Sequence, residues 1–155
     1  MRFGRRMEPM RGMSMNDDVS AILLAHGARM DETGHDIRAD VSRESWVPVM
    51  TQLASAGVEL SDLTALDRGE AVELVAWMLL SPNEQISVRT SCPDPDPLAD
   101  TLSGVFPIAE WAEREIFDLF GVTFVGHPDL TRILLPDSAT IFPLRKSFEL
   151  RESTW

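Results

Sequence analysis

The run from Ala71 to Leu80, AVELVAWMLL, constrains the fold of this chain more than any other stretch. Almost every residue in it is apolar, so an extended backbone would present apolar side chains on both of its faces. Turn-forming residues bound the run at Asp67-Arg68-Gly69 and at Ser81-Pro82-Asn83-Glu84. The pattern therefore predicts a central strand that is covered on both sides.

Shorter segments around this run predict further strands. Residues 36–41 alternate polar and apolar side chains, which is typical of a half-buried strand. Residues 58–66 are a weaker strand candidate. After the turn at 81–84, Ile86 and Val88 alternate with polar neighbours. We therefore expect a β-hairpin between the apolar run and residues 86–89.

Capping residues and glycines mark two helices in the first third of the chain. The first is expected from Asp17-Asp18 to Gly27. The second is expected through residues 46–57 with Ser45 as its N-cap, because Pro48 then falls in the first turn, where proline is tolerated. If Ser42 were the cap instead, Pro48 should distort the helix.

A loop and two further helices are expected in the second half. Residues 92–97 contain three prolines and two aspartates, which predicts a loop that includes Cys92. Residues 98–102 are expected to form a short helix. The main helix should begin near Pro107 and end at Gly121, because apolar residues recur between them at helical spacing.

Projection of the main helix predicts which side chains face the core. Glu115 falls near the middle of the apolar stripe, whereas Glu110 and Glu113 lie towards the polar side. A carboxylate removed from water needs a partner, and the candidates are Arg132, Arg145 and Lys146. Three tryptophans are expected in the core: Trp46, Trp77 and Trp111.

The outer face of the same helix suggests surface contacts. Arg114 and Asp118 are spaced i and i+4, so they should form an exposed pair of small energetic value. Phe117 points away from the predicted core stripe and is available for a second contact. Beyond the helix, residues 122–125 resemble a short strand, and Pro128 or Asp129 could begin a short helix.

Carboxylates gathered near His127 raise the alternative of a stand-alone metal-dependent enzyme. The candidates are Glu113, Glu115, Asp118 and Asp129. Helical spacing argues against it, because Glu113 and Glu115 differ by about 200° around a helix and cannot share one metal. We expect His127 instead to order the Gly126 to Asp129 turn by hydrogen bonding. We expect no catalytic residue and no metal site.

Charge and cysteine content exclude several classes of function. The formal net charge of −11 argues against nucleic-acid binding and against direct docking on an anionic membrane. The single cysteine, Cys92, cannot form an internal disulfide or hold an iron–sulfur cluster, which takes about four ligands. No apolar run approaches the ~20 residues of a membrane span.

Length and charge distribution predict one domain behind a basic tail. Arg2, Arg5, Arg6 and Arg11 face a single acidic residue within the first twelve positions. We expect 1–16 to be a disordered basic tail, 17–150 one domain and 151–155 a C-terminal end. The Arg5-Arg6 pair lacks a following apolar segment, so we expect no export signal.

The motifs between Glu113 and Lys146 resemble a known family. The sequence reads Glu113-Arg114-Glu115, then Asp118 with Phe120-Gly121, and later Arg132-Ile133-Leu134. The remaining motifs are Gly126-His127-Pro128-Asp129-Leu130 and Pro143-Leu144-Arg145-Lys146. This pattern is similar to the 30 kDa subunit of NADH-quinone oxidoreductase, which is respiratory complex I, and to related subunits of membrane-bound [NiFe] hydrogenases.

The resemblance implies a fold and a structural role. The expected fold is an α/β (α+β) two-layer structure with a mixed sheet of about four to five strands covered by helices, with a docking segment at 107–150. The expected function is that of a cofactor-free peripheral subunit on the cytoplasmic face of the inner membrane. Its expected partners are the large catalytic subunit and a neighbouring iron–sulfur subunit, with membrane contact only through the complex.

The family signature leaves the parent complex open. The complex would use iron–sulfur clusters with FMN, NADH and quinone, or nickel-iron in the hydrogenase alternative. Ile141-Phe142 stands where the family usually has Gly-His, and Ser147 where it has Asp, which keeps the hydrogenase relatives in contention. A free regulatory or assembly protein is a further alternative. The residues expected at the subunit interface or in the family motif are Glu113, Arg114, Glu115, Asp118, Gly121, Gly126, His127, Pro128, Asp129, Arg132, Arg145 and Lys146.

Overall fold

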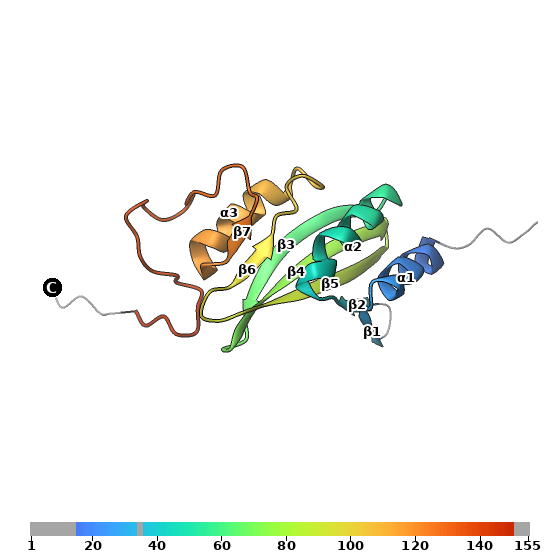
Figure 1. Cartoon of the computed structure of the whole chain (residues 1–155), viewed down its shortest axis with the longest axis horizontal. Coiled ribbons are helices and arrows are strands. Elements are labelled where there is room, and N and C mark those ends of the chain that lie inside the picture. The colour runs from blue at the N-terminus through green and yellow to red at the C-terminus, as the bar shows by residue number, and fades with distance from the viewer. Residues whose placement is uncertain (1–14, 34–35, 151–155) are drawn as a thin grey trace, which may run out of the picture.

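The computed structural model describes residues 15–33 and 36–150 (Figure 1). Its helices are α1 (Met15–Ala25), α2 (Arg43–Ser55) and α3 (Ala109–Phe120). Its strands are β1 (Arg29–Thr33), β2 (Asp36–Asp40), β3 (Glu59–Asp67), β4 (Ala71–Ser81), β5 (Glu84–Pro93), β6 (Leu98–Asp100) and β7 (Thr123–Val125). The first fourteen residues of the expected tail and the expected C-terminal end at 151–155 lie outside the described residues.

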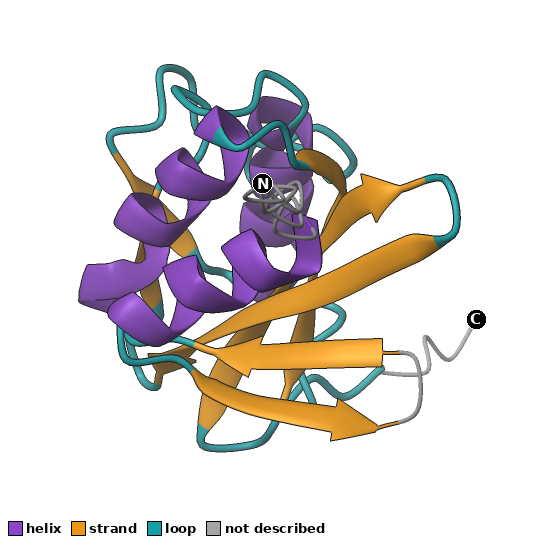
Figure 2. Ribbon diagram, turned by 90° about the vertical axis from the view of Figure 1, so that its right-hand side faces the viewer, coloured by secondary structure: helices purple, strands orange, loops and turns teal. Residues whose placement is uncertain are grey.

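Five strands form a mixed sheet in the order β1-β2-β5-β4-β3. The β2–β5 pair is parallel, and the other neighbours are antiparallel. The helices lie on one side of this sheet, as Figure 2 shows. The predicted fold class, a two-layer structure with a mixed sheet of four to five strands, is therefore confirmed. So are the β4–β5 hairpin and the strands expected at 36–41 and 58–66.

The apolar run forms β4, an interior strand between β5 and β3. Its helix-facing side chains are buried: Val72, Leu74, Ala76, Met78 and Leu80. On the other face only Val75 is buried, while Glu73, Trp77 and Leu79 are half-buried. The prediction of coverage on both sides was wrong, because β4 lies within a single sheet that carries its helices on one face.

The N-cap predicted for the second helix was also wrong. Helix α2 begins after Ser42, whose side-chain oxygen accepts the N–H of Ser45 at 3.3 Å. Pro48 therefore lies inside the helix, where it cannot donate to the carbonyl of Glu44. Burial of one helix face against the sheet stabilises α2 despite this loss: Trp46, Val49, Met50 and Leu53 are buried there.

Two short segments differ from their predictions for tertiary reasons. Residues 98–100 form β6, not a helix, and pair in parallel with β7, where Ala99 lies opposite Phe124. Both side chains are buried, and this burial outweighs the small helical preference of so short a segment. Strand β1 was not predicted because its sequence, RMDET, lacks a clear apolar alternation.

The main helix and its end are confirmed. Helix α3 ends at Gly121, which adopts a left-handed φ of 77° and donates its N–H to the carbonyl of Phe117. A Cβ at Gly121 would lie 3.0 Å from the ring of Phe142, so glycine is needed there for space as well as for conformation. The helix predicted at Pro128 or Asp129 is absent, and residues 126–150 form turns and extended stretches around α3.

Candidate functional site

Helix α3 buries different carboxylates from those that projection predicted. Glu113 and Asp118 are fully buried, whereas Glu115 is exposed. The difference arises because the projected stripe included Ile108 and Trp111, which are 55% and 62% exposed. Trp111 is therefore not a core residue. The buried residues of α3 are Ala109, Glu113, Ile116 and Asp118, while Glu115 and Leu119 line a hollow between α3 and β3.

Asp118 binds the segment that follows β7. Its Oδ2 accepts the backbone N–H groups of Ile133, Leu134 and Leu135 at 3.0, 2.7 and 3.0 Å. Its Oδ1 accepts a hydrogen bond from Nη1 of Arg132 at 2.6 Å, and the same nitrogen donates to the Asp118 carbonyl at 2.9 Å. These bonds take the N–H groups that a helix in this segment would use.

The charge state of Asp118 follows from this environment. Burial by itself raises the pKa of the carboxyl, because it disfavours the charged form. The N–H groups of Leu134 and Leu135, the guanidinium of Arg132 and the N–H of Ile133 outweigh burial, and they lower the pKa to about 2. Asp118 is therefore a charged internal anchor at neutral pH.

Glu113 anchors the loop on the other side of α3. Its Oε1 accepts the N–H of Leu102 at 2.6 Å, and its Oε2 accepts the hydroxyl of Thr101 at 2.5 Å. Burial raises the pKa of Glu113, and the bonds from Thr101 and Leu102 and the nearby His127 offset only part of that effect. Its position fixes the exit of β6 against the helix.

His127 orders the turn after β7, as predicted. Its Nδ1 accepts the N–H of Asp129 at 3.0 Å, while its Nε2 lies 3.0 Å from the carbonyl oxygen of Glu110. Because Nδ1 is an acceptor, we assign the ring proton to Nε2, which donates to Glu110. The ring is fully buried, with Nε2 3.9 Å from Oε2 of Glu113. His127 therefore also fixes the turn to α3.

Arg114 does not pair with Asp118, contrary to the prediction. Its Nε donates to the carbonyl of Thr131 at 3.1 Å, and its Nη2 donates to the Thr131 hydroxyl at 2.8 Å. It also lies over the ring of Trp111, 4.9 Å from the centroid, and 3.9 Å from the carboxylate of Asp129. Arg114 and Asp118 therefore bind successive parts of the same segment.

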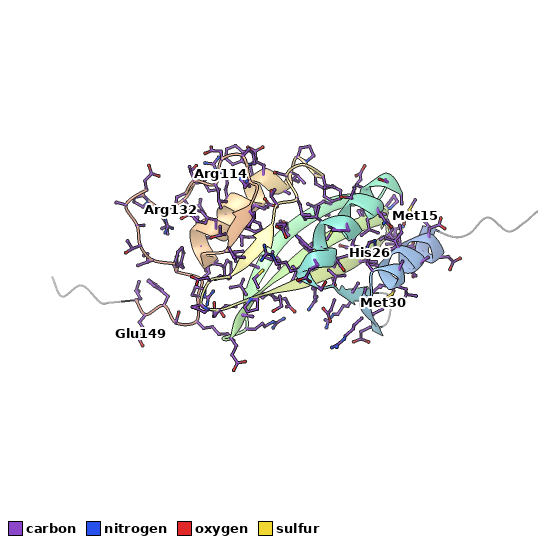
Figure 3. All side chains as sticks on the ribbon, in the orientation of Figure 1. Met15, His26, Met30, Arg114, Arg132 and Glu149 are labelled. Carbon is purple, nitrogen blue, oxygen red and sulfur yellow. The ribbon has the colours of Figure 1, made fainter. Side chains whose placement is uncertain are left out.

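Arg132 lies between two aromatic rings. Its guanidinium is 6.0 Å from the ring centroid of Phe117 and 5.2 Å from that of Phe142. Phe117 was expected to be available for a second contact, but it is half-buried beside Arg132 of the same chain. Figure 3 shows Arg114 and Arg132 where the segment after β7 passes α3.

A third anchor holds the Pro143-Leu144-Arg145-Lys146 motif. Nε of Arg145 lies 3.1 Å from Oδ2 of Asp67, and its Nη2 pairs with Asp94. Oδ2 of Asp67 also accepts the backbone N–H of Lys146 at 2.8 Å. The bond to Asp94 raises the pKa of Arg145. Sequence reasoning missed Asp67 and Asp94, and its only relevant signal was that both lie in predicted turns.

These contacts anchor backbone segments to α3 and to the sheet. Within residues 15–33 and 36–150, no group of three or more histidine, cysteine or acidic side chains is arranged to hold a metal. Cys92 lies at the end of β5, not in a loop, and burial raises the pKa of its thiol to about 11. No helix in the described part of the chain has the length and apolar character to cross a bilayer.

Asp118, Asp67 and Asp94 bind the segment that follows β7 and leave apolar side chains on its outside. Leu134, Ile141 and Leu144 are 61%, 45% and 51% exposed. Each lies in an anchored backbone. Leu134 donates its N–H to Asp118, Ile141 accepts from Arg132 at 3.4 Å, and Leu144 donates its N–H to the carbonyl of Leu119 at 3.1 Å. The arrangement presents apolar side chains from an ordered backbone, which suits protein–protein contact.

Comparison with known proteins shows that this chain is similar to subunits of respiratory complexes. The family model described as "Respiratory-chain NADH dehydrogenase, 30 Kd subunit" matches residues 39–154. The C subunit of NADH-quinone oxidoreductase from Neorickettsia sennetsu is 40% identical over 114 residues, which cover 70% of this chain and 61% of the relative. The corresponding subunit of Moorella thermoacetica is 44% identical over 95 residues, 59% of this chain and 64% of the relative. The match thus spans less than two thirds of each relative.

Two solved structures share the fold. A trypsin-resistant fragment (1-134) of Nqo5 aligns over 76% of this chain and all of the fragment, with a TM-score of 0.67 and 27% identity. A chain of the membrane-bound sulfane sulfur reductase, an archaeal respiratory membrane complex, aligns over 87% of this chain and 85% of its own length, with a TM-score of 0.69. Its 22% identity supports the fold alone. Because the family model covers most of the sequence, the chain belongs to the family of the 30 kDa subunit of respiratory-chain NADH dehydrogenase.

Proposed function

We propose that this chain is a peripheral subunit, without a cofactor of its own, of a membrane-associated complex like NADH-quinone oxidoreductase. It docks through residues 107–150 on the large subunit that forms the quinone site, and it supports assembly and electron transfer. The observation that carries the proposal is the ordered apolar segment after β7. Asp118 and Asp67 accept backbone N–H groups of this segment, Asp94 pairs with the side chain of Arg145, and Leu134, Ile141 and Leu144 remain exposed.

The buried members of the family motif act in this proposal as the frame of the docking surface. Asp118 and Arg132 bind one part of the segment, and Arg145 binds another. His127 and Glu113 set the turn and loop beside α3. An ordered backbone lowers the entropy lost on association, so rigid anchoring favours docking.

Affinity purification of the tagged, full-length chain from native membranes tests the proposal. The expected result is recovery of a stoichiometric large subunit with a nucleotide-binding flavin subunit and iron–sulfur subunits. A nickel-iron subunit in their place would assign the chain to a hydrogenase-type complex. Recovery of the chain without other subunits would contradict the proposal, and stoichiometric metal in the purified chain would support a stand-alone metal-dependent enzyme.

A further inference from the structure

Exposed apolar side chains lie at the start of α3 and on the segment bound beside it. Ile108 and Trp111 are 55% and 62% exposed, and Leu134, on the segment bound beside the helix, is 61% exposed. Single exposed apolar residues are common on protein surfaces, but an exposed tryptophan with apolar neighbours marks an interaction surface. We call Ile108, Trp111 and Leu134 the Trp111 patch.

Helix geometry places Trp111 and the segment that carries Leu134 along one side of α3. Trp111 and Asp118 are seven positions apart, so they share a face of α3 and lie about 10 Å apart along its axis. Arg114 connects Trp111 to Thr131, and Asp118 binds the N–H of Leu134. The bound segment therefore runs along the face that carries Trp111.

Trp111 is held in place before any partner binds. The guanidinium of Arg114 lies over its ring, 4.9 Å from the centroid, and two hydrogen bonds to Thr131 fix that guanidinium in turn. Arg114 itself is largely buried, with 14% of its side chain exposed. Tryptophan and arginine dominate binding hot spots, and a fixed side chain loses little entropy when it is covered.

A groove continues the patch beyond Ile108. It has a volume of about 460 Å³ and is formed by the end of α2, the start of β3 and the approach to α3. Its apolar lining includes Ala54, Val58, Leu60 and Phe106. Trp111 can enter a pocket on a partner, and the apolar groove can accept a side chain from the same partner.

The charges around the patch decide the chemistry of that partner. Glu59 lines the groove, Glu115 is exposed on the same face of α3 as Trp111, and the side chain of Asp129 is 60% exposed. The nearby cations, Arg114 and Arg132, are both engaged within the chain. An acidic rim, on a chain of net charge −11, repels an anionic bilayer and attracts a basic protein surface.

We propose that the Trp111 patch is a docking hot spot for a neighbouring subunit of the same complex, one that presents an apolar pocket rimmed by lysine or arginine. The inference rests on the proposed function and deepens it. In this inference most of the binding free energy comes from Trp111, and the charged motif residues hold Trp111 in position. Trp111 fills the partner's pocket, and the acidic rim pairs with the basic rim.

Tagged full-length variants in native membranes test the contribution of Trp111. Trp111→Ala should reduce the recovered large and iron–sulfur subunits by roughly tenfold or more, as truncation of a hot-spot tryptophan does. Leu24→Ala is the matched control, because Leu24 is also 62% exposed but lies on α1, at the opposite end of the molecule from residues 126–150 (Figure 1). Both variants should melt within a few degrees of the wild-type chain, since neither removes a buried side chain.

Charge reversal tests the basic rim. Glu115→Lys should weaken association and flatten its dependence on salt, whereas Asp18→Lys, at the exposed start of α1, should leave both unchanged. If Trp111→Ala and Glu115→Lys recover the subunits at the wild-type level, the hot-spot inference is wrong and the proposed function stands. If the wild-type chain itself recovers no subunits, the proposed function fails, and the inference fails with it.

Photo-crosslinking identifies what covers the patch. With p-benzoylphenylalanine in place of Trp111, the expected crosslink is to a lysine- or arginine-containing peptide of another subunit in the purified complex. A crosslink to lipid or to a second copy of this chain would overturn the assignment of the partner.

Discussion

Arg132 donates through one nitrogen to both the carboxylate and the backbone carbonyl of Asp118, at 2.6 and 2.9 Å. The other carboxylate oxygen accepts three consecutive backbone N–H groups from the same segment. A residue in the last turn of α3 thereby organises residues 126–150, which contain no helix or strand and which we call the strap. The stability of α3 and the shape of the exposed segment are linked through this one carboxylate.

Asp118→Ala should be strongly destabilising. It leaves the guanidinium of Arg132 without its ionic partner and three N–H groups without their acceptor in a buried site, and breaking a buried ion pair costs about 3–5 kcal/mol. Urea unfolding of the purified chain measures this loss. Limited proteolysis should also cut residues 132–142 faster in the variant. A variant as stable and as resistant as the wild type would show that the anchor is dispensable.

The low pKa of Asp118 predicts that the free energy of unfolding decreases in acid. Its folded pKa of about 2 lies below the unfolded value, about 3.9 for an aspartate, so its contribution is fully present above pH 4 and is lost as the pH falls towards 2. The free energy of unfolding, measured from neutral pH to pH 2, should therefore fall over that window. Asp118→Asn should make the fall shallower. An unchanged slope would contradict this origin of acid sensitivity.

Truncation of Glu113 should destabilise the protein more than truncation of Glu115. Glu113→Ala leaves the buried N–H of Leu102 without an acceptor, a loss of about 1–3 kcal/mol, whereas Glu115→Ala removes an exposed group and should change stability by at most about 0.5 kcal/mol. Chemical denaturation of the two variants side by side measures the difference. A larger loss for Glu115→Ala than for Glu113→Ala would favour the helical projection, in which Glu115 is the internal charge.

The raised pKa of Glu113 predicts a pH effect of the opposite sign to that of Asp118. The folded state holds the proton more tightly than the unfolded chain, so stability declines as the pH rises from the unfolded value of about 4.3 through the folded pKa. Glu113→Gln keeps an acceptor for Leu102 and cannot titrate, so it should remove this decline. Unfolding free energies compared above pH 4 test the sign.

Arg145→Ala combined with Lys146→Ala should reduce recovery of the large subunit from membranes. Arg145→Ala by itself leaves Asp67 and Asp94 without their shared cation, so the strap should also become more sensitive to protease. Lys146→Ala separates the two effects, since its side chain is exposed and only its backbone N–H binds Asp67. Unchanged recovery with the double variant would count against docking by this segment.

Local sequence signals predicted the main elements because each has a local physical cause. The bounded apolar run produced β4, and the left-handed Gly121 ended α3 where glycine was expected. Period-two alternation located β2, and the turn at Pro82-Asn83 located the hairpin. The same signals missed β1 and β6, whose pairing depends on partner strands rather than on their own sequence.

The candidate site was predicted in composition but not in arrangement. The sequence by itself determined which charged residues gather near α3, how long the helix is and that His127 orders a turn. Only the tertiary structure decided that Glu113 and Asp118 are buried, that Glu115 is exposed and that Trp111 faces outward. The physical reason is that α3 carries apolar residues on two faces, so periodicity cannot choose between them. Packing against β3 and the N–H groups of the strap make that choice.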